Sequence, residues 1–175
     1  MKNIILQGLP GIGKTTLTKK IANKLKEMAI DITGFYTEEL RENNYRIGFD
    51  VVTLDNKRGI LARKSNAEDN SKYKVGNYSV HIEEFEKMVL PIFENVKSII
   101  IIDEIGKMEL FSKKFQANIE RVITDDNIRI VATVPLKATL PLIQKIKNNN
   151  SSHLITVNAG NRDKLLDEII PLITK

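Results

Sequence analysis

The fold of this chain is decided by the stretch Gly8-Leu9-Pro10-Gly11-Ile12-Gly13-Lys14-Thr15-Thr16. Its first eight residues fit the pattern G-x-x-x-x-G-K-[ST], in which successive backbone N–H groups of a glycine-rich loop surround phosphate groups. An apolar run over residues 3–7 precedes the loop and predicts a buried strand. Residues 14–28 follow with one apolar helical face, made by Leu17, Ile21, Leu25 and Met28. Strand, loop and helix in this order predict a P-loop that binds the phosphates of a nucleotide.

The residue types of this loop predict a role for each part of it. Glycines permit the close approach and the unusual dihedral angles that a phosphate cradle requires. The positive N-terminus of the following helix faces the same anion. Lys14 is expected to neutralise the β- and γ-phosphates during catalysis, and the Thr15 hydroxyl to bind Mg²⁺. The expected nucleotide-binding residues are therefore Gly8, Leu9, Pro10, Gly11, Ile12, Gly13, Lys14, Thr15 and Thr16.

A second motif, a pair of acidic residues, follows another apolar run. Residues 99–102 are all isoleucine, without polar alternation, which predicts a strand buried on both faces. Asp103 and Glu104 follow this strand directly. In P-loop proteins an acidic residue at that strand end completes the Mg²⁺ site, so we assign Asp103 to the metal and expect Glu104 to orient or deprotonate the attacking water. The alternative is that Asp103 only ends the strand and Glu104 only faces solvent.

The rest of the chain predicts an α/β fold of a single domain, residues 1–175. Strand-like pieces at 32–36, 45–54 and 59–62, separated by turns, predict an antiparallel hairpin at one side of the sheet. Residues 65–78 are polar and read as a loop. Strands alternating with helices then predict a parallel sheet covered on both faces, a three-layer α/β/α sandwich; the predicted helices are 82–94, 113–124, 138–147 and 162–173, and the strands are 98–103, 129–133 and 154–157.

Composition excludes several classes of protein. The 175 residues contain no cysteine, which excludes disulfides, thiolate metal sites and cysteine nucleophiles. Residues 1–6 do not resemble a signal peptide, and no apolar run approaches the ~20 residues of a membrane span. We therefore expect a cytoplasmic protein without a membrane partner. The net charge of +5 comes from lysines scattered among acids, so an RNA or protein partner is only weakly indicated, and we expect a monomer.

Together, these motifs resemble the family of small thermophilic and cancer-related nucleoside-triphosphatases. The resemblance is carried by residues 8–16, 34–39, 46–50, 103–110, 132–135 and 161–163, with Asp103-Glu104-Ile105-Gly106-Lys107-Met108-Glu109-Leu110 as its most specific part. Ala132 departs from it, at a position where we expect glycine. The resemblance implies a RecA-like sandwich and slow, Mg²⁺-dependent cleavage of several nucleoside triphosphates to the diphosphate and phosphate. It places Asp103 at the magnesium position and Glu104 at that of the general base.

Other polar residues have two open readings each. Thr133 either bonds the water or phosphate or simply ends a strand, and Lys107 either neutralises charge or lies on the surface. Residues 37–39 and Arg41 either line the site or form a solvated hairpin end. Arg41 and Arg46 are the candidates for an internal arginine finger. Residues 161–163 (Asn161, Arg162 and Asp163) either begin the last helix or contact the base and ribose. We assign no function to His81 and His153.

The sequence is compatible with three functions. The first is a nucleoside-triphosphate phosphohydrolase of broad base tolerance. The second is a nucleotide or small-molecule kinase, for which an arginine-rich lid is expected and is not evident. The third is a nucleotide-switched module that binds RNA or a protein and is reset by slow hydrolysis. The adjacent acidic pair, Asp103 and Glu104, favours the hydrolase.

Overall fold

A computed structural model describes residues 3–66 and 71–174 of the chain. The strands are β1 (Asn3–Gly8), β2 (Ile32–Glu42), β3 (Tyr45–Thr53), β4 (Arg58–Lys64), β5 (Lys74–Val75), β6 (Tyr78–Val80), β7 (Ile99–Asp103), β8 (Arg129–Pro135) and β9 (Ser152–Thr156). The helices are α1 (Lys14–Glu27), α2 (Ile82–Glu94), α3 (Lys113–Ile123), α4 (Pro141–Lys147) and α5 (Leu165–Thr174), with a short 3₁₀ helix, η1 (Glu109–Phe111). None of the described helices is both long and apolar enough to cross a membrane.

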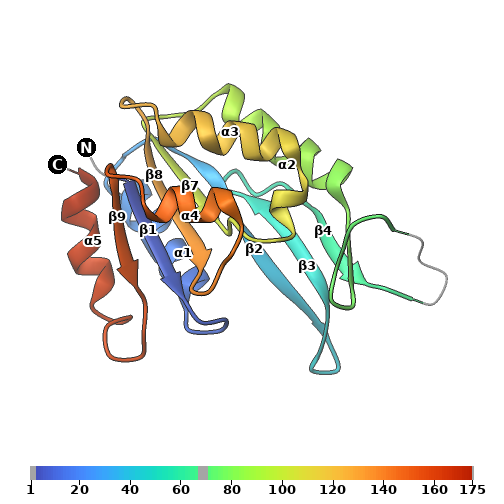
Figure 1. Ribbon diagram of the computed structural model, residues 1–175. Coiled ribbons are helices and arrows are strands. Elements are labelled where there is room, and N and C mark those ends of the chain that lie inside the picture. The colour runs from blue at the N-terminus through green and yellow to red at the C-terminus, as the bar shows by residue number, and fades with distance from the viewer. Residues whose placement is uncertain (1–2, 67–70, 175) are drawn as a thin grey trace.

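The described strands form one sheet in the order β5-β6-β4-β3-β2-β7-β8-β1-β9. From β2 to β9 the neighbouring strands run parallel, whereas β2, β3, β4, β6 and β5 pair antiparallel. The predicted α/β fold is thus confirmed, and its antiparallel side is larger than a single hairpin. Because β8 lies between β1 and β7, the loop after β1 and the acids after β7 emerge at the same edge of the sheet, the lower edge in Figure 1.

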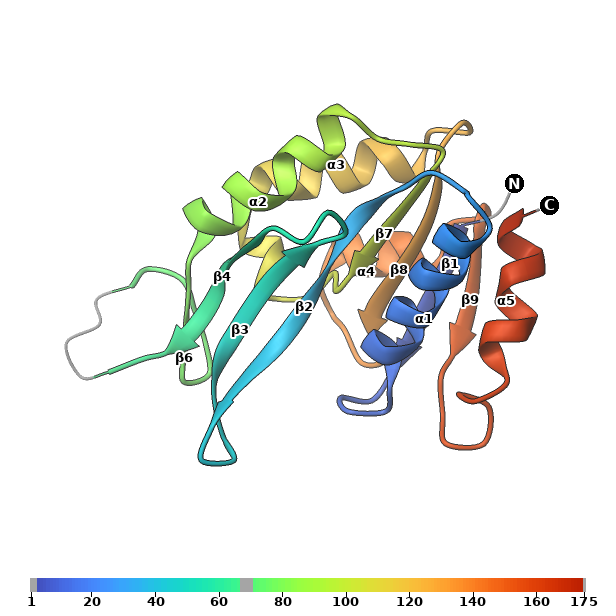
Figure 2. The ribbon, with the colours of Figure 1, turned by 180° about the vertical axis from the view of Figure 1, so that it is seen from behind.

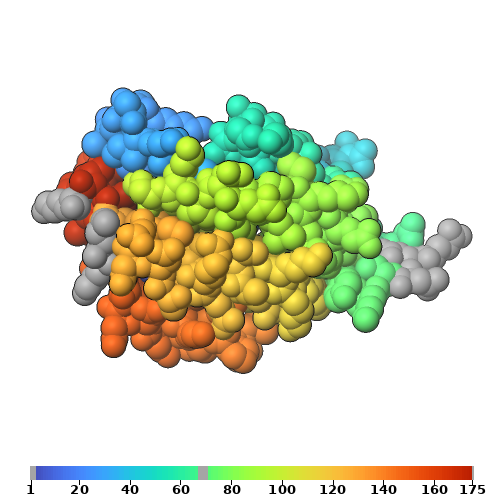
Figure 3. Space-filling view, turned by 90° about the horizontal axis from the view of Figure 1, so that it is seen from above, coloured from blue at the N-terminus to red at the C-terminus, as the bar shows by residue number. Residues whose placement is uncertain are grey.

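Helices cover both faces of the parallel half of the sheet. Figure 1 shows α2, α3 and α4 over one face, and Figure 2 shows α1 and α5 over the other. Successive strand residues alternate between the two cores: Ile4 and Leu6 pack with α1 and α5, while Ile5 packs in the core with Phe85 and Phe115. In Figure 3, α2, α3 and α4 form neighbouring bands over their face. Both cores therefore hold the strands whose ends carry the predicted site.

Two predicted elements differ at their ends because of local backbone chemistry. Strand β2 continues to Glu42 instead of ending at Tyr36, since its polar outer half pairs with β3. The turn at its end was predicted, and both Asn43 and Asn44 have positive φ, as a two-residue hairpin turn requires. Helix α4 begins at Pro141 instead of Ala138, because proline suits the first helical turn and the residue before it is extended.

The last helix and the polar segment 65–78 also differ from the prediction. Helix α5 begins at Leu165 instead of Arg162, since the amides of Asn158 and Asn161 hold the preceding residues in turns. The segment 65–78 contains β5 and the first residue of β6, so it is not only a loop. Residues 67–70 of that segment lie outside the described residues.

Candidate active site

The stretch 8–16 forms a tight turn between β1 and α1, as predicted. Gly11 and Gly13 have φ values of +75° and +111°, a region that side-chain-bearing residues rarely adopt. Gly13 is the N-cap of α1, so the unpaired N–H groups of the first helical turn face the loop. Leu9, Pro10 and Gly11 are exposed at the apex of the turn. Backbone donors and the positive helix end thus converge on a single place, the requirement for binding phosphate.

Lys14 is the buried cation of this turn. Its side chain folds back along the loop, where the Nζ atom donates to the carbonyl oxygens of Gly8 and Leu9 at 3.1 and 3.2 Å. Only 8% of the residue is exposed. An ammonium held at this depth is poorly screened by water, so it acts strongly on nearby anions.

Asp103 is buried at the end of β7, as the isoleucine run predicted. Its Oδ1 atom accepts a hydrogen bond of 2.6 Å from the hydroxyl of Thr133. Within residues 3–66 and 71–174, its Oδ2 atom is buried without a hydrogen-bond partner. Burial raises the pKa of Asp103, while the hydroxyls of Thr133 and Thr15 and the charge of Lys14 lower it. A buried carboxylate oxygen with a free lone pair next to Thr15 has the chemistry of a hard-cation ligand.

Glu104 follows Asp103 and lies at the same cleft as Lys14. Burial raises the pKa of its carboxyl group; the nearby charge of Lys14 lowers it and that of Asp103 raises it further. A raised pKa brings a carboxylate closer to the range in which it accepts protons efficiently near neutral pH. The residue is partly exposed, so water can reach it.

A third carboxyl group, that of Glu109, lies beside Glu104 and was not singled out from the sequence. The backbone N–H of Gly106 donates to Glu109 Oε2 at 3.1 Å. A methyl group added at Gly106 would lie 3.1 Å from that atom and 3.6 Å from Glu104 Oε1, so both carboxyl groups flank Gly106. Burial, reinforced by the charge of Glu104, raises the pKa of Glu109 to about 8. The only signal in the sequence was that Glu109 follows Gly106 by three residues. This spacing becomes informative in the structure, where the turn that leads into η1 brings the Glu109 side chain back to the Gly106 N–H.

Of these groups, Lys14 and Glu104 line one cleft of about 570 Å³. The P-loop and α1 form one wall, β2 and β3 form the other, and Glu104 lies between them. Lys19 and Phe49 also line the cleft, although neither was predicted as a site residue. The lining residues are Pro10, Gly11, Gly13, Lys14, Thr15, Thr16, Lys19, Thr37, Glu38, Glu39, Arg46, Phe49 and Glu104.

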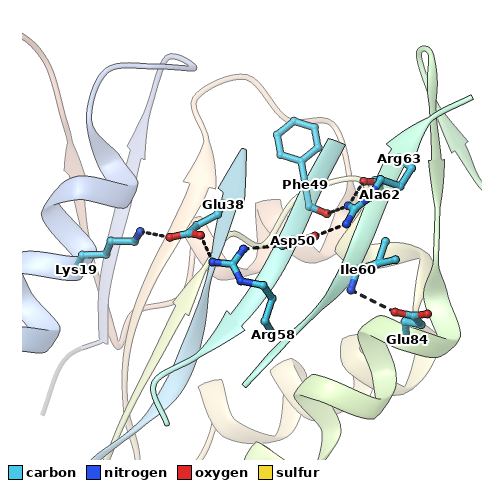
Figure 4. Close-up of polar contacts among 9 residues, drawn as sticks. All are labelled: Lys19, Glu38, Phe49, Asp50, Arg58, Ile60, Ala62, Arg63 and Glu84. Carbon is cyan, nitrogen blue, oxygen red and sulfur yellow. Dashed lines mark hydrogen bonds and ion pairs between the residues drawn. The ribbon is translucent and has the colours of Figure 1, made fainter. Parts of the chain in front are cut away.

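A ladder of ion pairs ties the β-sheet wall to α1 (Figure 4). Lys19 on α1 donates to Glu38 on β2 at 2.9 Å, and Arg58 on β4 also pairs with Glu38. Asp50 on β3 then accepts from Arg58 at 2.9 Å and from Arg63 at 2.6 Å. The bonds from Lys19 and Arg58 lower the pKa of Glu38. The wall opposite the P-loop is therefore held by charges that cross four neighbouring elements.

The remaining polar residues have defined places in the structure. Thr37, Glu38, Glu39 and Arg46 line the cleft, whereas Arg41 is not among its described lining residues. The hydroxyl of Thr133 is bonded to Asp103. Lys107 is exposed and lines a different hollow, beside Leu110 and Leu142.

The predicted residues of the turn 158–163 also have defined places. Arg162 reaches the P-loop, where its Nη1 atom donates to the carbonyl of Ile12 at 3.4 Å. Asn161 is bonded to Thr156 and to the backbone of Asn158, and Asp163 is exposed in the turn before α5. His81 is the N-cap residue of α2 and His153 is exposed on β9; both lie outside the cleft.

Comparison with known proteins places this geometry in a family. A family model described as "NTPase" matches residues 3–170. The chain is 41% identical to nucleoside-triphosphatase THEP1 of Aquifex aeolicus, covering 98% of this chain and 99% of the relative. It is 37% identical to the human cancer-related nucleoside-triphosphatase, covering 98% and 96%. Among solved structures, the crystal structure of THEP1 from Aquifex aeolicus superposes with a TM-score of 0.86 at 38% identity, over 99% of both chains.

The solution structure of a human cancer-related nucleoside triphosphatase superposes with a TM-score of 0.85 at 36% identity, covering 99% of this chain and 97% of that one. These matches run over nearly the full length of each protein, so they concern the whole fold and not only the phosphate-binding turn. The resemblance noted from the motifs is thereby confirmed. The chain belongs to the NTPase family, and it is a nucleoside-triphosphatase.

Proposed function

We propose that the chain is a Mg²⁺-dependent nucleoside-triphosphate phosphohydrolase that accepts several bases and releases the diphosphate and phosphate. The observation that carries this proposal is the shared cleft: Lys14, Thr15 and Glu104 line it together, and Asp103 lies at its buried end beside Thr15. A phosphate-binding turn, a carboxylate suited to a hard cation and a water-accessible carboxylate are the parts that hydrolysis of a triphosphate needs.

In this proposal the triphosphate binds along the P-loop. The turn 8–13 and the first turn of α1 donate N–H groups to the phosphate oxygens. Lys14 exchanges its bonds to the carbonyls of Gly8 and Leu9 for bonds to the β- and γ-phosphates. Phosphate oxygens attract an ammonium more strongly than neutral carbonyls do, because they carry charge.

Thr15 and Asp103 fit a magnesium ion. Asp103 offers the unpaired Oδ2 atom, and Thr133 fixes the orientation of the same carboxylate through Oδ1. Among the described residues no group of three or more histidine, cysteine, aspartate or glutamate side chains is arranged to hold a metal ion by itself, so the remaining ligands would be phosphate oxygens and water, as Mg²⁺ prefers. A bound Mg²⁺ would neutralise the charge that builds up on the phosphates.

Glu104 acts on the attacking water in this proposal. It takes one proton from the water as the water oxygen forms a bond to the γ-phosphorus. The bond between that phosphorus and the β–γ bridging oxygen breaks, and the bridging oxygen leaves with the diphosphate. Proton transfer to a positioned base contributes typically 10²–10⁴-fold to a rate.

Tolerance of the base is supported by the turn beside the P-loop. A site discriminates strongly when it offers unpaired donors and acceptors to the substrate's polar edge. The Asn161 amide is instead bonded to the carbonyl of Thr156, and the Asn158 side chain accepts from the backbone N–H groups of Gly160 and Asn161. The Asn161 amide and the Asn158 amide oxygen are engaged within the protein, which favours low discrimination among bases.

Phosphate release from ATP, GTP, CTP and UTP, each with Mg²⁺ and with the metal chelated, tests this function. We expect release from several of the four with Mg²⁺ and a loss of most activity on chelation. Release from a single triphosphate would refute the base tolerance, and release unaffected by chelation would refute the metal dependence. Binding without release would refute hydrolysis by the chain alone and direct the search to a phosphoryl acceptor or an activating partner.

A further inference from the structure

The two arginines at the end of the β2–β3 hairpin share one carboxylate but differ in where they lie. Arg41 Nη2 is 2.5 Å from Glu39 Oε1, and Arg46 Nη2 is 2.7 Å from Glu39 Oε2. Arg41 also donates to the carbonyl of Asn44 at the hairpin tip, at 3.0 Å. Arg46 lines the cleft with Lys14 and Glu104, and Arg41 is not among the described residues of that lining.

Arg46 is the cation that is best placed to move within the cleft. The cations among its described lining residues are Lys14, Lys19 and Arg46. Lys14 belongs to the P-loop, and Lys19 is engaged by Glu38 at 2.9 Å and by the ring of Tyr36, whose centroid is 4.0 Å from the ammonium. The side chain of Arg46 is 43% exposed and that of Glu39 is 29% exposed. An ion pair this open to water is weak and is exchanged easily for a stronger partner.

The surroundings of Arg46 suit a guanidinium that approaches phosphate. Its Cζ atom lies 5.3 Å from the ring centroid of Phe49, which also lines the cleft, so the guanidinium is supported on an aromatic wall. The wall itself is held to α1 by the pairs from Lys19 to Glu38 and on to Arg58. The planar fork of arginine matches the oxygens of a phosphate better than an ammonium does.

We propose that Arg46 is a further catalytic residue, an arginine that the β2–β3 hairpin supplies within the chain to the γ-phosphate. Its guanidinium exchanges Glu39 for the equatorial oxygens of the transferring phosphoryl group. The charge on these oxygens is greatest in the transition state, so this contact accelerates cleavage more than it strengthens binding of the triphosphate. The inference rests on the proposed hydrolysis and names the group that completes its site.

Three variants separate this role from a structural one: Arg46→Ala, Arg46→Lys and the matched control Arg41→Ala, which breaks a bond to the same carboxylate. An arginine that stabilises a phosphoryl-transfer transition state is worth roughly 10³–10⁵ in kcat when supplied by a partner. We expect Arg46→Ala to lower kcat on the order of 10²-fold or more with little change in KM, and Arg41→Ala to stay within about twofold of wild type. Arg46→Lys should fall between them.

Binding of a transition-state mimic gives a second readout that does not depend on turnover. The affinity for a nucleoside diphosphate with Mg²⁺ and aluminium fluoride is compared with the affinity for the diphosphate and Mg²⁺ alone. The fluoride complex should strengthen binding to wild type and Arg41→Ala but not to Arg46→Ala, while binding of the diphosphate alone should be equal in all three. Added guanidinium ion, below concentrations that unfold the protein, should restore part of the activity of Arg46→Ala.

The possible outcomes distinguish a failure of this inference from a failure of the proposed function. If wild type and Arg41→Ala release phosphate and Arg46→Ala does so equally well, the role of Arg46 is refuted and hydrolysis stands. If Arg46→Ala raises KM without lowering kcat, Arg46 is a binding residue and the inference is also refuted. The same holds if the variant binds the diphosphate with Mg²⁺, without fluoride, more weakly than wild type does. If wild type releases no phosphate, the proposed function itself fails. Should Arg46→Ala not fold, Arg46→Lys carries the same comparison.

Discussion

Three carboxyl groups lie close together at the end of β7, and their surroundings divide their roles. Asp103 is fully buried with one oxygen held by Thr133 and the other unpaired. Glu104 is partly exposed and lines the cleft. Glu109 is buried and receives a hydrogen bond from Gly106. Since neighbouring carboxylates repel each other, we expect at least one of the three to be protonated near neutral pH. Burial and the charge of Glu104 raise the pKa of Glu109 to about 8.

The raised pKa of Glu109 predicts a dependence of stability on pH. The unfolded chain releases this proton near pH 4.5, and the folded chain releases it at about pH 8. Between these values the unfolded state binds fewer protons, so a rise in pH lowers the free energy of unfolding. Glu109→Gln removes this titration and keeps an oxygen that can accept from Gly106.

The measurement is the free energy of unfolding in urea of wild type and Glu109→Gln, at about pH 5.5 and pH 7.5. We expect the variant to gain roughly 2 kcal/mol relative to wild type over this interval, since one pH unit of unequal protonation corresponds to about 1.4 kcal/mol. Equal changes with pH in both proteins would contradict the raised pKa of Glu109.

At the residue scale the sequence predicted the groups that belong to local motifs. The P-loop needs only neighbours in the chain, and Asp103 and Glu104 follow a recognisable buried strand. The choice between Arg41 and Arg46 could not be made from the sequence, because it depends on which side chain of the β2–β3 hairpin faces the cleft. The place of Glu109 depends on η1, a single turn that brings its side chain back to Gly106.

At the element scale, the contact between β2 and β7 is unusually close at one position. Gly34 pairs with Ile101 in the parallel register, and its φ is +142°. A Cβ atom at Gly34 would lie 1.9 Å from the carbonyl oxygen of Ile101. That neighbour is backbone within a buried strand, so it cannot rotate away. This position joins the antiparallel wall of the cleft to the strand that carries Asp103.

Gly34→Ala is therefore expected to destabilise the protein strongly. The two strands must separate or the backbone must change conformation, which places the loss at about 3–5 kcal/mol. The control is Gly76→Ala, since Gly76 also has a positive φ (+56°) but has no atom within 4 Å of an added Cβ. Gly76→Ala should lower the free energy of unfolding by only about 1–2 kcal/mol. Chemical denaturation of both variants checks the comparison, and similar losses in the two would show that the close approach is of no consequence.

The elements themselves were predicted where hydrophobic periodicity is strong. The central strands and α1, α2 and α3 lie where their apolar patterns indicated. The outer half of β2 was missed, because Thr37–Glu42 is polar and its strand form depends on pairing with β3. The start of α5 was missed because the turn before it is fixed by side-chain bonds of Asn158 and Asn161, which compete with helix formation.

At the scale of the whole molecule, the two halves of the sheet have different tasks. The parallel half carries the P-loop and Asp103 at one edge. Helices α1 and α5 cover one of its faces, and α2, α3 and α4 cover the other. The antiparallel half extends beyond it (Figure 1). Residues of β2 and β3 in this half supply the opposite wall of the cleft. The sequence predicted the first half from its strand–helix alternation, but the place of the second half beside the P-loop depends on the pairing of β2 with β7 in the complete sheet.

Because the cleft joins both halves, a bound nucleotide should stabilise the whole fold. A ligand that binds only the folded state at about 100 times its Kd adds roughly 2.7 kcal/mol to the free energy of unfolding. For a domain of this size that corresponds to an increase in Tm of roughly 5–10 °C. We expect this increase with a non-hydrolysable triphosphate and Mg²⁺, and its loss in Lys14→Ala. Lys20→Ala, an exposed lysine on the same helix, should keep it. A full increase in Lys14→Ala would contradict binding at the P-loop.

The central claim is that Glu104 activates water for cleavage of a triphosphate held by the P-loop. Phosphate release by Glu104→Gln, measured at saturating triphosphate and Mg²⁺, tests it most directly when nucleotide affinity is measured on the same sample. Because the variant keeps the shape of the side chain and removes the base, we expect kcat to fall roughly 10²–10⁴-fold with the affinity retained. The exposed glutamate variant Glu94→Gln should behave as wild type. Release by Glu104→Gln at the rate of wild type would contradict the account.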